Sequence, residues 1–127
     1  NDTSRAIVQV VEELNRARAE AGEDPMAAYT FDAGPNAVLY MREKDVPTVL
    51  RAVQHYFPGA SFDDPFQMAS NDAPLPVTFR HDIVPVHPAE SVRRVIHTRV
   101  GDGPRVLEHG LGPQSLLTLE GVPVRTT

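Results

Sequence analysis

Apolar residues recur at three- and four-residue steps in the first 21 residues of the chain. They are Ile7, Val10, Val11, Leu14, Ala17 and Ala21. This spacing predicts one amphipathic helix over residues 1–21, in which a side chain of residues 1–3 caps the first amides and Gly22 supplies a left-handed stop. The opposite face is predicted to be a solvated surface. Its charged residues are Glu12, Glu13, Arg16 and Glu20.

Two strand-like segments follow a breaker at residues 23–25. Aromatic and threonine residues favour a strand over residues 26–31, and residues 37–41 suit another. Residues 32–36 between them read Asp-Ala-Gly-Pro-Asn. Glycine and asparagine tolerate positive φ, and proline presets φ and removes a donor, so this segment predicts a turn.

A second amphipathic helix is predicted after Asp45, which serves as its N-cap. Pro47 lies in the first turn, where a missing amide costs little. Pro58-Gly59 ends this helix. The apolar stripe of the helix is Val46, Val49, Leu50, Val53 and Phe57.

The rest of the chain has weaker periodicity. Residues 58–76 are rich in aspartate and proline and predict a long loop. Residues 77–79 and 83–84 favour short strand pieces, which the nearby prolines restrict to sheet edges. Residues 92–100 form the clearest later strand.

Residues 101–104 read Gly-Asp-Gly-Pro and predict a turn toward residues 105–107, and the tail from Gly110 is not assigned. A leading helix, two strands, a helix and further strands indicate the α+β class, with a small antiparallel sheet and helices packed on one face. The length of 127 residues favours a single domain over residues 1–127.

Composition excludes several kinds of protein. The chain has no cysteine, which excludes disulfides and thiolate zinc sites. Its net charge is −5, and its 12 basic residues are spread along the chain, which disfavours a nucleic-acid surface. No apolar run approaches the roughly 18 residues that span a bilayer. The N-terminus has neither a signal peptide nor an initiator methionine, so we expect a piece of a larger protein.

Histidine and carboxylate side chains offer only weak metal-site candidates. None of the histidines is paired at the i, i+4 spacing that places two imidazoles on one metal, so surface or core roles are favoured and no metal site is predicted. Asp63 and Asp64 could attract a cation, but they lack the alternating oxygen ligands of a calcium loop, and a solvated loop is favoured. The histidines are His55, His81, His87, His97 and His109.

The glycine pairs do not predict a phosphate site. Gly101-x-Gly103 and Gly110-x-Gly112 are each followed by proline rather than by the start of a helix, so both are predicted to be turns. No serine has the glycine-flanked setting of an acyl-transfer nucleophile.

Asp32 is the one residue whose position suggests chemistry. It follows an apolar strand at a tight turn, which can hold its carboxylate rigidly near a sheet edge. By residue type alone, a structural role is favoured, in which the side chain bonds turn amides. The spacing leaves both roles open.

A longer run of residues resembles a known family. Residues 28–40 read Ala-Tyr-Thr-Phe-Asp-Ala-Gly-Pro-Asn-Ala-Val-Leu-Tyr, which is similar to the C-terminal motif of the mevalonate diphosphate decarboxylases of the GHMP kinase superfamily. Further similar segments follow in the family's order. They are Asn1-Asp2-Thr3-Ser4, Phe57-Pro58-Gly59, Val100-Gly101-x-Gly103-Pro104 and Leu111-Gly112-Pro113.

The resemblance implies a function. Enzymes of this family use ATP and Mg²⁺ to phosphorylate the 3-hydroxyl of mevalonate 5-diphosphate, and loss of phosphate and carbon dioxide gives isopentenyl diphosphate for isoprenoid and sterol synthesis. It implies the ferredoxin-like C-terminal domain of a cytoplasmic, homodimeric, two-domain enzyme whose N-terminal ATP-binding domain is absent here. We therefore expect this chain alone to be inactive and to self-associate through the exposed domain interface.

In the family, the aspartate of the DAGPN motif faces the substrate hydroxyl between the two domains, which implies a catalytic role for Asp32. The role as base, orienter or charge partner stays open, and the last two are favoured. Two alternatives remain: a stand-alone α+β ligand-binding or regulatory module, and a pseudoenzyme homologue. Roughly 200 upstream residues with a glycine- and serine-rich phosphate loop would favour the enzyme.

Overall fold

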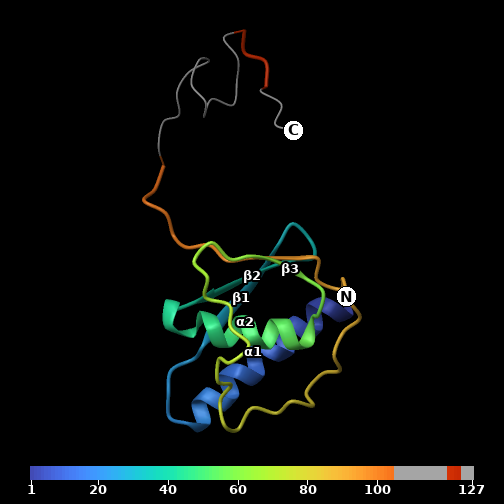
Figure 1. Cartoon of the computed structure of the whole chain (residues 1–127), viewed down its shortest axis with the longest axis vertical. Coiled ribbons are helices and arrows are strands. Elements are labelled where there is room, and N and C mark those ends of the chain that lie inside the picture. Colours follow the sequence, from blue (N-terminus) through green and yellow to red (C-terminus); the bar gives the residue numbers. More distant parts are fainter. Residues whose placement is uncertain (105–119, 124–127) are drawn as a thin grey trace.

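The structure is a computed structural model that describes residues 1–104 and 120–123. Its two helices pack together through one apolar core, and a hairpin of strands lies against the first helix (Figure 1). The elements in chain order are α1 (Asp2–Glu20), β1 (Ala27–Asp32), β2 (Asn36–Met41), η1 (Glu43–Asp45), α2 (Val46–Tyr56), β3 (Ser61–Asp63) and β4 (Arg94–Ile96). The α+β class is confirmed.

Helix α1 follows the predicted pattern. Asn1 caps it, because its Oδ1 accepts a hydrogen bond from the Ser4 amide at 2.7 Å. Gly22 follows the helix with φ at 74°, which confirms the left-handed stop. The predicted solvated face is wrong at one position, because Glu13 is only 6% exposed. The buried apolar residues of α1 are Ala6, Val10, Val11, Leu14 and Ala17.

The predicted strands and turn form an antiparallel hairpin. Strand β1 pairs with β2 from Ala27 opposite Met41 to Asp32 opposite Asn36. Ala33 and Gly34 have positive φ angles of 51° and 86°, which confirms the turn between β1 and β2.

Asn15 of α1 fixes the open end of this hairpin. Its side-chain Oδ1 accepts hydrogen bonds from the amides of Met26, at 2.7 Å, and Ala27, at 3.1 Å. Its Nδ2 donates to the Ala27 carbonyl at 2.8 Å. A two-stranded hairpin alone is marginally stable, so this side chain and the packing on α1 hold it in place.

Helix α2 begins at Val46, directly after the 3-10 turn η1, with proline in its first turn as predicted. Asp45 occupies the N-cap position, but its carboxylate makes no capping hydrogen bond. It pairs instead with Arg18 at the end of α1, so the residue joins the two helices. Tyr56 and Phe57 close the helix and are almost fully buried.

The later strand predictions need correction. The predicted loop of residues 58–76 contains β3, which pairs in parallel with β4, and β4 is only part of the predicted strand of residues 92–100. The described residues therefore form two separate two-stranded sheets, one antiparallel and one parallel, in place of the predicted single antiparallel sheet. Residues 77–79 and 83–84 are not strands, because the prolines around them lack the amides that a ladder needs. Residues 105–107 and the tail from Gly110 lie outside the described residues.

No helix within the described part of the chain has the length and apolar character needed to cross a membrane.

Candidate functional site

Asp32 lies at the last position of β1, opposite Asn36, where the hairpin closes. The side chain is exposed rather than buried under its sheet. Within residues 1–104 and 120–123, no turn amide and no cation bonds its carboxylate. The turn therefore does not depend on this side chain, and both of its oxygens are free to accept hydrogen bonds from a ligand.

Asp32 shares one face of the hairpin with other exposed side chains. Residues opposite each other in the ladder, and every second residue along a strand, lie on the same face. Val38 on this face is 38% exposed and Tyr40 is 61% exposed. We call this surface the outer hairpin face. Its residues are Ala28, Thr30, Asp32, Asn36, Val38 and Tyr40.

The turn beside Asp32 is set by backbone conformation. Gly34 has φ at 86°, a region that side chains rarely adopt. A Cβ on Gly34 would meet no atom within 4 Å, so the position favours glycine because of its backbone angle and not because of a close contact. The consecutive left-handed residues Ala33 and Gly34 reverse the chain directly after Asp32 and fix its direction.

Asp64 and His97 form a second polar site, which corrects the prediction of a solvated loop. The Nδ1 of His97 lies 2.9 Å from Oδ1 of Asp64, and the two side chains are only 12% and 11% exposed. The other oxygen, Oδ2, accepts a hydrogen bond from the Ala69 amide at 2.7 Å. The neighbouring Asp63 also has a partner, because it pairs with Arg94 across the β3–β4 ladder. These bonds tie the loop after β3 to the end of β4.

The pairing predicts acid sensitivity. The hydrogen bond from His97, followed by that from the Ala69 amide, lowers the pKa of Asp64 below its usual 3.8. The stability that the ionised Asp64 contributes is therefore fully present above the pKa that this residue has in the unfolded chain. It is lost as the pH falls through the lower pKa that the residue has in the folded protein. We expect Asp64→Asn to flatten the loss of stability on acidification below about pH 4. Urea denaturation of both proteins at a series of acid pH values tests this, and parallel curves would contradict it.

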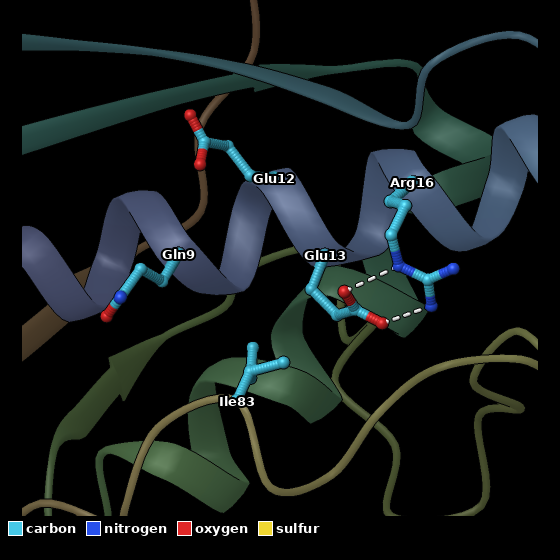
Figure 2. Close-up of a pocket in the computed structure, with 5 residues that line it drawn as sticks. All are labelled: Gln9, Glu12, Glu13, Arg16 and Ile83. Carbon is cyan, nitrogen blue, oxygen red and sulfur yellow. Dashed lines mark hydrogen bonds and ion pairs between the residues drawn. The ribbon is translucent and has the colours of Figure 1, made fainter.

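A groove opens beside α1 (Figure 2). Its volume is about 370 Å³. Glu13 lies at its wall and accepts hydrogen bonds from Arg16 Nε at 2.8 Å and from the Arg80 amide at 2.9 Å. The bond from Arg16 is the main reason that the pKa of Glu13 lies below its ordinary value. The lining residues are Gln9, Glu12, Glu13, Arg16 and Ile83.

The contacts around this groove stabilise the fold. Arg16 also donates to the Thr78 carbonyl at 2.7 Å, so Glu13 and Arg16 together hold residues 78–80 against α1. Asp32 is not among the residues that line the groove. The sequence pattern predicted that Glu13 is solvated. Its position three residues after Val10 and four before Ala17, however, places it beside the apolar stripe.

Residues 1–104 and 120–123 contain no group of three or more histidine or carboxylate side chains that could hold a metal ion. The structure does bring His55 and His81 together, with ring centroids 6.2 Å apart, although their sequence spacing gave no such signal. Residues 101–104 form a bend in which Gly103 has φ at 104°. His109 and the second glycine pair lie outside the described residues.

Comparisons with known proteins show the family of the chain. Residues 1–107 match the family described as mevalonate 5-diphosphate decarboxylase C-terminal domain. The chain is 39% identical to a diphosphomevalonate decarboxylase of Ganoderma lucidum, covering 97% of the chain and 31% of the relative. It is 39% identical to the enzyme of that name from Rattus norvegicus, covering 91% and 29%. The chain is also 40% identical to the Schizosaccharomyces pombe protein of that name, and the match covers 97% of the chain and 28% of the relative.

The chain thus spans less than a third of the length of these relatives. The matched region includes every helix and strand in the part of the chain that the structure describes, among them the strand that ends in Asp32. This chain belongs to the family of mevalonate 5-diphosphate decarboxylase C-terminal domains.

Proposed function

We propose that the protein containing this chain is an ATP-dependent decarboxylase that converts mevalonate 5-diphosphate to isopentenyl diphosphate, and that Asp32 faces the 3-hydroxyl of the substrate. One observation carries the proposal for Asp32. The carboxylate of a family-matched motif is exposed, has no partner in the described part of the chain, and is held at the closed end of a hairpin.

A free carboxylate at this position suits the chemistry. Phosphoryl transfer passes through a loose transition state, so the enzyme gains most by holding the attacking oxygen in line with the γ-phosphorus. Asp32 would accept a hydrogen bond from the tertiary hydroxyl and orient it. When the phosphate leaves, positive charge develops on the tertiary carbon, and a fixed anion nearby stabilises that charge.

The remaining part of such an enzyme would supply the other contacts. We infer that residues 1–127 form one domain and that ATP and Mg²⁺ bind mainly to an N-terminal domain outside this chain. Relatives about three times as long as this chain leave room for such a domain. We further propose that the complete enzyme is a cytoplasmic homodimer that works in isoprenoid and sterol synthesis.

The proposed function is tested with the complete protein and with this chain alone. Purified complete protein should release carbon dioxide from mevalonate 5-diphosphate only when ATP and Mg²⁺ are present. The 127-residue chain should show no turnover, because it carries no more than one side of the proposed site. Turnover by the short chain, or none by the complete protein, would contradict the proposal.

The exposed apolar side chains support a covered interface in the complete enzyme. Isolated residues of this kind are normal, but two of them, Val38 and Tyr40, lie together on the outer hairpin face that carries Asp32. We propose that the outer hairpin face meets the rest of the enzyme. The large exposed apolar residues in the described ranges are Tyr29, Val38, Tyr40, Val77, Val86, Ile96, Val100 and Val122.

This interface predicts self-association of the isolated chain. We expect light scattering to show a mass above 13.9 kDa that rises with concentration, together with binding of a hydrophobic dye. Tyr40→Ser should reduce both effects, because it removes the most exposed aromatic ring of the outer hairpin face. Val77→Ser, on a loop away from that face in sequence, is the control. A stable monomer that binds no dye would contradict the interface.

A further inference from the structure

His55 and His81 lie side by side, although 25 residues separate them in the chain. His55 is in the last turn of α2, and His81 is in the loop that follows Phe79. Their ring centroids are 6.2 Å apart and their planes are inclined by 81°. Both side chains are exposed, and neither ring nitrogen is hydrogen-bonded to another residue in the described ranges.

The backbone around the two rings is fixed by Tyr56. The fully buried Tyr56 donates its hydroxyl hydrogen to the His81 carbonyl at 2.7 Å. The ring centroids of Tyr56 and His55 are 4.7 Å apart, and those of Phe79 and His81 are 5.2 Å apart. Tyr56 therefore ties the end of α2 to the loop that carries His81.

Negative charge lies near the two rings, although Arg80 precedes His81 in the chain. His55 lies at the C-terminal end of α2, where the helix dipole is negative. Asp82 follows His81, and its charge acts on the Tyr56 hydroxyl, whose pKa is raised by burial first and by Asp82 second.

We propose that His55 and His81 form a two-imidazole surface site for a borderline divalent transition-metal cation such as Zn²⁺, with water in the remaining coordination positions. Imidazole nitrogen is a preferred ligand for Zn²⁺, Cu²⁺ and Ni²⁺. Two imidazoles bound to one tetrahedral Zn²⁺ have centroids about 5 Å apart, as follows from a Zn–N length of about 2 Å. Small side-chain rotations of the exposed rings close the difference from 6.2 Å.

Titration of Zn²⁺ into the 127-residue chain, followed by calorimetry, tests this site. We expect one Zn²⁺ per chain, and we expect His55→Ala and His81→Ala each to raise Kd by at least about tenfold. His87→Ala is the matched control and should bind like the parent, because His87 stacks on Phe57 and its Nδ1 contacts the Pro85 carbonyl. Binding should weaken at acid pH, since metal ligation needs neutral imidazoles.

A second measurement locates the ion and does not depend on enzyme activity. In NMR spectra, Zn²⁺ should shift the ring signals of His55 and His81 and leave those of His97 unchanged, because Asp64 holds His97 elsewhere. Far-UV circular dichroism of the two alanine variants should match the parent, since both side chains are exposed. Absence of binding at millimolar Zn²⁺, or parent-like affinity in both variants, would overturn the site whatever the outcome for Asp32.

Discussion

Asp32→Asn in the complete enzyme should lower kcat by at least about 10². In the proposed site, the amide would still form a hydrogen bond to the substrate hydroxyl, but it would lack the charge to stabilise the developing cation and the basicity to take a proton. Steady-state assays of ATP-dependent carbon dioxide release give the measurement. Since the carboxylate has no partner in the described ranges, the variant should keep the thermal stability of the parent.

Asp72→Asn provides the control for Asp32. Asp72 is another exposed aspartate, but it lies in the long loop between β3 and β4 rather than on the hairpin. Its replacement should leave kcat unchanged. Near-normal turnover in Asp32→Asn would remove the catalytic role of this residue, and an equal loss in both variants would show that the effect is not specific.

The largest effect on stability is expected from Glu13→Ala. Glu13 is 6% exposed and holds both the Arg16 guanidinium and the Arg80 amide. Its removal leaves an arginine without its main partner and an amide without an acceptor, so we expect the free energy of unfolding to fall by about 2–3 kcal/mol. Urea denaturation measures this change.

Glu12→Ala is the matched control for this prediction. Glu12 is the preceding glutamate on α1 and lines the same groove, but it is exposed. Its replacement should change stability by less than about 0.5 kcal/mol. Glu13→Gln should fall between the two, because the amide oxygen can still accept the bond from Arg80. Equal stabilities of the two alanine variants would show that Glu13 does not hold residues 78–80.

Local patterns were enough to predict α1, α2 and the hairpin. Each of these elements is specified by neighbouring residues, such as the Asn1 cap and the positive φ of Gly34. Strands β3 and β4 could not be predicted in this way. Each has three residues, and their pairing joins segments about 30 residues apart, which no local periodicity records.

The candidate site could likewise be predicted only in part from the sequence. The position of Asp32 follows from the local turn, so its placement at the end of β1 could be predicted from the sequence. The pairs Asp64–His97 and His55–His81 arise only when the loops fold back on the strands and helices. Spacing rules that apply within one helix therefore could not predict either pair.

Asn15 anchors the hairpin at Ala27, and Asp32 lies five residues farther along the same strand. At about 3.4 Å per residue, the carboxylate is about 17 Å from its anchor. A rotation of the hairpin by a few degrees about Asn15 would therefore displace Asp32 by about an ångström. In the proposed enzyme, the position of the Asp32 carboxylate would therefore depend in part on an amide side chain at the far end of the hairpin.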